Sequence, residues 1–359
     1  ILGTFITRSG VLDSVHAFTE SGIGPMFLAF FTLVVVSVLF LIILRGDDIR
    51  TEGSIDTPIS RTGAFLTNNL LFAGFAFVVL LGTVFPLIVE AVNGNRISVG
   101  NPYFVSMTMP IGFLLLFLMA IAPALPWGKA GSEVLSKRLW WPGVFGTLVT
   151  VIAVLLGARG WTTTLAIGLA GFAIGGAARP LILAVRSRGF AGLFGRSSGG
   201  MVVHVGVAII AVALAVSSSF VRQTEFSFSA VGDSAVFAGH QLTFQGNVVV
   251  EKEEKIETQV KVAVDGKTFT PSINIFPFSG QPIGTPSTRS TWRDDVQLSV
   301  LKIPENEGES TVVRITVQPL VWWIWVGGGV MALGTLMSAV PSRRTDRASK
   351  EVVANEVTT

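Results

Sequence analysis

The sequence predicts a mainly α polytopic membrane protein with about seven transmembrane helices and a small extracytoplasmic all-β domain inserted before the last of them. Half of the 359 residues are hydrophobic, 14% are charged, and the mean hydropathy is +0.64. Soluble domains carry roughly 25% charged residues, so this chain has too few charges to cover a surface exposed to water. The hydrophobic residues also gather in long runs, and about 20 such residues cross a bilayer as a helix. We therefore expect a lipid bilayer to surround most of the chain.

Seven apolar runs account for the expected membrane crossings, and the fourth of them is the shortest. The runs are Pro25–Leu44, Leu70–Val92, Met107–Leu125, Pro142–Gly157, Thr162–Ala184, Met201–Phe220 and Leu320–Val340. Because each run is long and apolar enough to cross a membrane, we expect it to form a spanning helix.

Basic residues between the runs predict the orientation. The segments after the odd-numbered runs are rich in them, with Arg45, Arg50 and Arg61, then Lys129, Lys137 and Arg138, then Arg186, Arg188 and Arg196, and last Arg343, Arg344, Arg347 and Lys350. The short segments on the opposite side carry Arg8, Arg96 and Arg159. Since Lys and Arg gather on the cytoplasmic side, we expect a cytoplasmic C-terminal tail.

This topology divides the chain into five parts. We expect an extracytoplasmic segment over residues 1–24, a six-helix membrane region over 25–220 and an extracytoplasmic β domain over 221–319, followed by a last membrane helix over 320–340 and a cytoplasmic tail over 341–359. Trp322, Trp323 and Trp325 fall where the last helix meets the outer surface, as in an interfacial aromatic belt.

Alternating apolar and polar residues predict the strands of the β domain. Gln259–Val264 alternates and is followed by Asp265-Gly266, a hairpin turn signal. Glu225–Ser229, Val296–Val300 and Val313–Val317 alternate as well. Several short strands separated by turns favour a small antiparallel sandwich or barrel.

The residue types present exclude several kinds of site. The chain has no cysteine, which excludes disulfides, zinc–thiolate sites and iron–sulfur clusters. The net charge of +3 is explained by the orienting residues, so we expect no nucleic-acid partner. Three histidines, His16, His204 and His240, remain as nitrogen ligands for a metal. The first residue is Ile1, and we expect the sequence to be the C-terminal part of a longer protein.

His204 is the candidate ligand inside the membrane. It follows Gly199-Gly200-Met201 and is expected about 6 Å inside the sixth run, at 1.5 Å per residue. An imidazole surrounded by hydrocarbon needs partners for its nitrogens. One interpretation is a hydrogen bond between helices that glycines allow to pack closely. The other is an axial bond to the iron of a haem held between helices, and the residues alone leave both open.

The other two histidines lie outside the runs. His16 lies just before the first run, where an ordinary polar loop residue is the simpler interpretation. A haem ligand at the outer edge is chemically possible there, since Arg8 is close enough in sequence to pair with a propionate. We expect His240 to be a solvent-facing strand residue.

Several short strings, in the same order, resemble one membrane protein family. They are Leu2-Gly3-Thr4, Thr7–Leu12, Ser14–Phe18, Ser60-Arg61, Asn68–Leu71, Leu81–Pro86, Ile97–Gly100, Pro102–Phe104, Met201–Gly206 and Pro319–Trp325. Together they resemble the cytochrome c maturation protein F (CcmF/NrfE) family, the membrane haem lyase subunit of the system I pathway. The resemblance spans nearly the whole chain.

The resemblance implies roles for two of the histidines. In that family two outer histidines flank the haem that is delivered for attachment, and two membrane histidines ligate a resident haem b. His16 matches the second outer histidine and His204 the second membrane histidine. The first of each pair, and a tryptophan-rich haem-handling motif, are expected upstream of Ile1. No role is implied for His240.

The implied activity is that of a cytochrome c haem lyase, of the holocytochrome c synthase type, in the cell (inner) membrane. A haem chaperone would present haem at the outer face, where His16 and Arg8 hold it, and the CxxCH thiols of apocytochrome c would add to its vinyl groups. The resident haem near His204 would supply electrons, and thiol-reducing subunits would complete the complex. The alternatives are a polytopic transporter, which predicts broken helices and charges at the membrane midplane, and a scaffold without haem chemistry.

Overall fold

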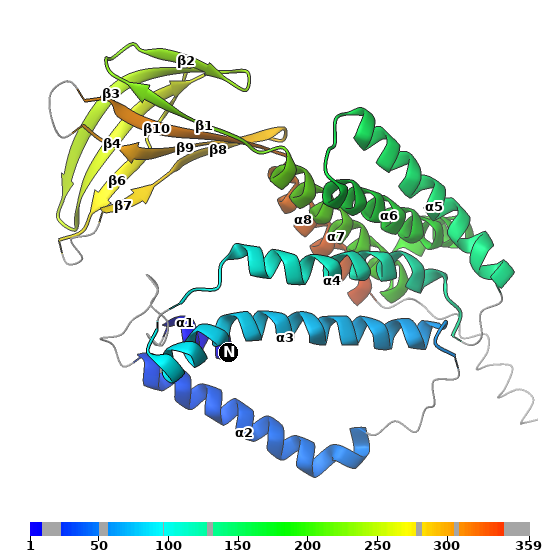
Figure 1. Ribbon diagram of the computed structural model, residues 1–359. Helices are drawn as coiled ribbons and strands as arrows, with labels where there is room; N and C mark the ends of the chain where they lie inside the picture. The colour runs from blue at the N-terminus through cyan, green and yellow to red at the C-terminus, as the bar shows by residue number, and fades with distance from the viewer. Residues whose placement is uncertain are drawn as a thin grey trace, which may run out of the picture. The chain divides into compact units, whose positions relative to one another are not determined.

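The computed structural model describes residues 1–8, 23–49, 57–95, 97–127, 132–277, 282–304 and 309–340. These residues divide into two compact units, one comprising Ile1–Leu115 with Leu125–Ala130, the other Leu116–Ala124 with Gly131–Thr359. Within the described ranges, 7 helices are long and apolar enough to cross a membrane, and a β region precedes the last of them. The predicted fold class, mainly helical with an inserted β region, is confirmed (Figure 1).

Each predicted run coincides with one helix. The helices are α1 (Leu2–Arg8), α2 (Ile23–Ile49), α3 (Arg61–Asn93), α4 (Asn101–Ile121), α5 (Ser132–Leu155), α6 (Trp161–Arg188), α7 (Arg196–Ser219) and α8 (Trp322–Ala339), with short 3-10 turns η1 (Ala122–Ala124) and η2 (Gly189–Leu193). α1 is too short to span a bilayer, and α2 to α8 correspond to the seven runs in order.

Two helices begin well before the predicted positions. α3 begins at Arg61, not Leu70, because Ser60 caps it by accepting a hydrogen bond from the Gly63 N–H at 3.1 Å. α5 begins at Ser132 and holds Pro142 in its interior. Proline is tolerated inside membrane helices, where neighbouring groups satisfy the freed carbonyl, so Pro142 is not a starting residue.

In the first unit, α3 and α4 meet at a glycine. A Cβ added at Gly82 would lie 2.6 Å from Cε1 of Tyr103, so only glycine allows this approach. The Tyr103 hydroxyl donates to the carbonyl of Val78 at 3.3 Å. Most large apolar side chains of α2 are exposed, among them Ile43 at 80%. Such a helix is stable in hydrocarbon and unstable in water.

The second unit contains α5 to α8, η1, η2 and the β domain. α6 packs against both α5 and α7, and α7 packs against α8 along its length (Figure 1). Four fully buried alanines, Ala120, Ala170, Ala173 and Ala208, join the residues before η1 to α6 and α7. Small side chains of this kind let membrane helices approach closely.

The β domain lies between α7 and α8 in the chain. Its strands are β1 (Arg222–Phe228), β2 (Ser234–Phe237), β3 (His240–Lys252), β4 (Lys255–Val264), β5 (Lys267–Phe269), β6 (Ser272–Ile275), β7 (Pro282–Thr285), β8 (Ser287–Ser290), β9 (Asp294–Lys302) and β10 (Thr311–Pro319). One sheet has the order β1-β10-β9-β8 and the other β2-β3-β4-β6-β7, with β5 also paired to β4. The four predicted strands overlap with β1, β4, β9 and β10.

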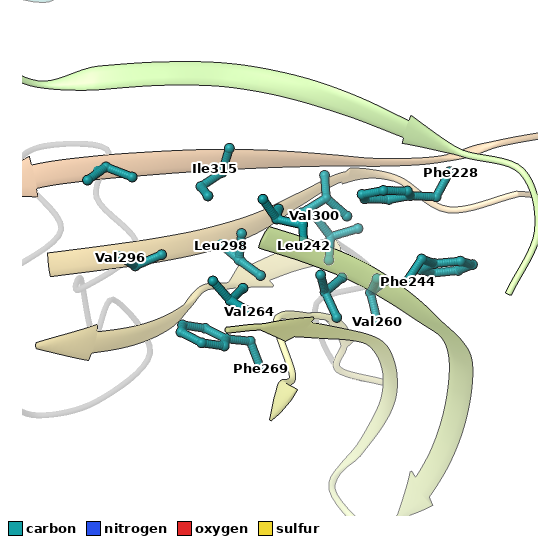
Figure 2. Close-up of a cluster of buried hydrophobic side chains, with 13 residues drawn as sticks. Phe228, Leu242, Phe244, Val260, Val264, Phe269, Val296, Leu298, Val300 and Ile315 are labelled. Carbon is teal, nitrogen blue, oxygen red and sulfur yellow. The ribbon is translucent and has the colours of Figure 1, made fainter. Parts of the chain in front are cut away.

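The core of the β domain lies between the two sheets (Figure 2). Leu298 and Ile315 from one sheet and Leu242 and Val264 from the other are at most 1% exposed. The rings of Phe228 and Phe244 stack across the sheets with centroids 5.4 Å apart. The alternating pattern of each strand therefore places one row of apolar side chains in this core.

Asp265 and Gly266 form the predicted hairpin turn. Their φ angles are +49° and +76°, and Val264 pairs with Lys267 on either side of them. A two-residue turn with both φ values positive matches the right-handed twist of the strands that it joins. This hairpin joins β4 to β5.

Glu257 on β4 is a nearly buried carboxylate, with its side chain 11% exposed. Lys252 donates to its Oε2 at 2.8 Å and Gln259 to its Oε1 at 3.0 Å, and Lys255 Nζ lies 3.3 Å from Oε2. These contacts, with the Lys252 hydrogen bond first, lower the pKa of Glu257 from 4.5 to about 2. The carboxylate therefore stabilises the β3–β4 hairpin above pH 4.5, and this stabilisation is lost as the pH falls towards about 2.

We expect amide hydrogen exchange in β3 and β4 of the full chain to accelerate as the pH falls through this window, beyond the intrinsic pH dependence of exchange. Glu257→Gln is expected to exchange faster at neutral pH and to lack the additional acid-induced change. Glu254 is exposed in the turn of the same hairpin, and Glu254→Gln is the matched control. Identical acid behaviour of Glu257→Gln and the unmodified chain would contradict this account.

Candidate functional site around His204

α7 is fixed at its first turn by two hydrogen bonds. The N–H of Gly195 donates to the carbonyl of Met337 on α8 at 2.9 Å, and the Ser198 hydroxyl donates to the carbonyl of Gly192 at 2.6 Å. Because α7 begins at Arg196 and not at Met201, His204 lies about 12 Å from the helix start, at 1.5 Å per residue. The glycine-rich segment before Met201 is helical, and the depth of His204 in the membrane stays a prediction.

One face of α7 packs on α8 through glycines. A Cβ at Gly206 would lie 2.7 Å from the carbonyl oxygen of Gly327, and one at Gly334 would lie 2.7 Å from the backbone nitrogen of Val203. Gly327 and Gly334 are seven residues apart on α8, so they lie on the same side of that helix. Only residues without a side chain allow these two backbones to come so close.

His204 lies on a different face of α7. It precedes Ala208 by four residues, so it lies one turn before Ala208 on the same side of the helix. Ala208 is fully buried against Ala170 and Ala173 of α6 and against Ala120. The glycine contacts with α8 therefore fix α7, and His204 lies on the side of α7 that carries the alanine cluster.

The Nδ1 atom of His204 is buried and has no hydrogen-bond partner among the described residues. A buried polar atom without a partner costs about 1–3 kcal/mol, and more in hydrocarbon, where water cannot reach it. The interpretation of His204 as a hydrogen-bonded packing residue requires a partner, and Nδ1 has none in the described part of the chain. The packing interpretation therefore has no support at Nδ1, and a haem iron, which bonds to one imidazole nitrogen and leaves the other as an N–H, is compatible with His204.

Two of the cavities along these helices have walls formed by α5 and α6, and His204 lines neither of them. One, of about 560 Å³, lies between α5, α6, α7 and the base of the β domain. The other, of about 800 Å³, follows α5 and α6 on the side of Gly146 and Gly168.

The predicted outer residues lie in the first unit or outside the described residues. Arg8 is the last residue of α1 and is exposed, and α1 packs against α2 with Ile6 buried. His16 lies outside the described residues. The roles of Arg8 and His16 at the outer face therefore stay predictions.

His240 is not a solvent-facing residue, and that prediction was wrong. Its side chain is 12% exposed, with Nδ1 2.7 Å from Oδ2 of Asp265 and Nε2 3.7 Å from Oδ2 of Asp294. The hydrogen bond from His240 lowers the pKa of Asp265, helped by the N–H of Gln241 and by the charge of Arg289. The imidazole thus links the β2–β3 turn to the β4–β5 turn and to the start of β9.

The sequence does not reveal this cluster, because His240 is far from both carboxylates along the chain. The strand register was the available signal. Leu242 pairs with Val264, which brings His240 level with the Asp265-Gly266 turn. A correct pairing of β3 with β4 would have predicted the contact.

Several of the strings that carry the family resemblance have packing roles. The Leu81–Pro86 string contributes Gly82, and the Pro102–Phe104 string contributes the two rings that pack against it. Arg61, beside the capping Ser60, lies with Cζ 5.0 Å from the ring centroid of Trp127. These strings therefore position the helices of the first unit.

Comparisons with known proteins identify the family. No family model matches the chain. Curated relatives include cytochrome c-type biogenesis protein CycK of Bradyrhizobium diazoefficiens, 31% identical over 99% of this chain, and cytochrome c-type biogenesis protein CcmF of Escherichia coli, 30% identical over 99%. CcmF of Pseudomonas aeruginosa is 29% identical over 96% of this chain. The chain belongs to the CcmF/CycK/NrfE family.

A solved structure supports the same assignment. The structure titled "Cytochrome c Heme Lyase CcmF" matches 95% of this chain at 30% identity, with a TM-score of 0.70. The chain covers 52% of that structure and 53% to 56% of the CcmF and CycK relatives named above, so it spans about half the length of the proteins that it matches. The predicted resemblance to the CcmF/NrfE family is thus confirmed.

Proposed function

We propose that this chain forms part of a haem lyase that attaches haem covalently to apocytochrome c at the outer face of the cell membrane. Membership of the CcmF/CycK/NrfE family supports the pathway. The observation that supports the haem site is a histidine on a membrane helix whose buried Nδ1 has no hydrogen-bond partner within the described ranges. The same proposal places the C-terminal tail in the cytoplasm and the β domain outside, in line with the basic residues.

In this proposal His204 would hold the iron of a resident haem b. The α7–α8 glycine contacts hold the backbone around His204. When bound, the resident haem would supply electrons to the attachment site. His204 would fix its position in the membrane.

The substrate haem would be held at the outer end of the first unit by His16 and Arg8. Each cysteine S–H of the apocytochrome CxxCH motif adds across a vinyl C=C bond, with the sulfur bonded to one carbon and the hydrogen to the other. A catalyst without cysteine suffices, because both thiols belong to apocytochrome c. The chain would act by positioning the two partners, together with a haem chaperone and thiol-reducing subunits.

An attachment assay tests the outer site. The full-length protein is co-expressed with a reporter apocytochrome, and covalently bound haem is stained after denaturing electrophoresis. His16→Ala is expected to lower the yield about tenfold or more, the order of loss for a ligand at a metal. Arg8→Gln is expected to lower it less, because an exposed arginine contributes a propionate contact only.

The matched control is His240→Ala, since His240 lies in the β domain between two carboxylates. Its yield is expected to stay close to that of the unmodified protein at equal protein level. Full attachment with His16→Ala would contradict the assignment of the outer site.

A further inference from the structure

The cavity of about 560 Å³ in the second unit has an apolar part and a charged rim. Its apolar walls include Ile152 of α5, Ile167 of α6 and Val212 of α7. Its rim includes Arg222 at the start of β1 and Arg293 just before β9. Cavities of roughly 300–1,000 Å³ hold small molecules in proteins, so this one is large enough for part of an amphiphile.

The free charges at the rim are positive. Neither the Arg222 nor the Arg293 side chain forms a hydrogen bond or an ion pair with any residue in the described part of the chain, and both are exposed. Asp294, also at the rim, is engaged by the Thr291 hydroxyl at 2.9 Å and lies 3.7 Å from His240 Nε2. Two arginines without partners match a phosphate, which accepts paired hydrogen bonds from guanidinium groups.

The segment that carries Arg293 is held in place by Leu320, just before α8, and by Trp323 in its first turn. The N–H of Leu320 donates to the carbonyl of Arg293 at 3.0 Å, and Nε1 of Trp323 donates to the carbonyl of Trp292 at 2.9 Å. The Thr291 hydroxyl also accepts from the N–H of Asp294 at 3.0 Å. The rim is therefore formed before any ligand binds, which lowers the cost of binding.

The rim of the cavity lies at the depth expected for lipid headgroups, which favours a lipid over a soluble anion as the ligand. Trp322, Trp323 and Trp325 begin α8, and tryptophans at helix ends mark the headgroup region of a bilayer. Arg293 is bonded to this same helix start, while Ile152 and Val212 lie on membrane-crossing segments. The cavity thus has cations at headgroup level and apolar walls at acyl-chain level.

We propose that this cavity binds one membrane phospholipid, with its phosphodiester between Arg222 and Arg293 and an acyl chain against α5, α6 and α7. Such a lipid contacts the outer ends of three helices and the base of the β domain at once. It therefore stabilises the attachment of the β domain to the membrane helices. This site is separate from His204 and does not depend on haem.

Lipid binding to the full chain tests the proposal. The protein is depleted of lipid in detergent, palmitoyl-oleoyl phosphatidylglycerol is added, and bound lipid is counted by native mass spectrometry. One tightly bound lipid is expected, with a rise in the unfolding temperature. The double variant Arg222→Gln with Arg293→Gln is expected to weaken binding about tenfold or more, because two charged hydrogen-bond donors are lost.

Two further variants complete the test. Arg159 is exposed in the loop between α5 and α6 and does not line the cavity, so Arg159→Gln is expected to bind as the unmodified chain does. Ala153→Phe should fill the apolar part and also weaken binding. Equal lipid retention by the double variant and by Arg159→Gln would overturn the proposal, as would displacement of the lipid by stoichiometric haemin.

Discussion

Replacement of His204 by alanine is expected to lower the haem content of the purified full-length protein about tenfold or more, as when a metal loses a ligand. The proposal assigns the imidazole of His204 to the haem iron, since its buried Nδ1 has no hydrogen-bond partner among the described residues. Alanine offers the iron no ligand. Haem per protein is measured by the pyridine haemochrome method after purification in detergent.

The chain offers a matched control in His240, which is bonded to Asp265 in the β domain. His240→Ala is expected to keep the haem content of the unmodified protein. An equal loss of haem in both variants would show that either substitution disturbs folding, and would count against a specific ligand at position 204.

The second large effect is expected at the contact between α7 and α8. Gly206→Ala should destabilise the protein by about 1–3 kcal/mol, the usual cost of overpacking. The added Cβ would lie 2.6 Å from Cγ of Met331 and 2.7 Å from the carbonyl oxygen of Gly327. Since Gly327 contributes backbone, α8 must move as a whole. The unfolding temperature in detergent measures the effect.

Gly200 on the same helix is the matched control for this substitution. A Cβ at Gly200 meets nothing within 4 Å. Because alanine is the better helix former by about 1 kcal/mol, Gly200→Ala should leave the unfolding temperature unchanged or raise it. Opposite signs for the two variants are expected, and a stabilising Gly206→Ala would refute the close packing of α7 on α8.

The helices were largely predictable because hydrophobic length is a strong signal in membrane proteins. Their starting residues were not, since hydropathy says little about capping. α3 begins at Arg61 because Ser60 caps it, and the polar residues Asn68 and Asn69 then lie inside the helix. Hydropathy alone had placed the start after them, at Leu70.

The β domain was predictable only where its strands alternate regularly. β4, β9 and β10 alternate between buried and less buried residues over most of their length. β3 was missed because its register shifts between Phe244 and Gly246, and because Val248–Val250 is a continuous apolar run. Such an irregularity breaks the period of two on which strand prediction depends.

The candidate site was predictable to different degrees. His204 stood out because a histidine inside an apolar run must have partners. Its unpartnered nitrogen and its place beside the alanine cluster required the structure, since both depend on helices distant in sequence. The contacts of His240 depend on strand register in the same way.

The most direct test of the account is a reduced-minus-oxidised absorbance spectrum of the purified full-length protein. We predict the signal of a low-spin haem b in the unmodified protein, its loss in His204→Ala, and its recovery when imidazole is added to that variant together with haem. Imidazole can replace the missing ligand only if the side chain at position 204 bonds to the iron. A spectrum without a haem b signal in the unmodified protein, or an unchanged signal in His204→Ala, would contradict the account.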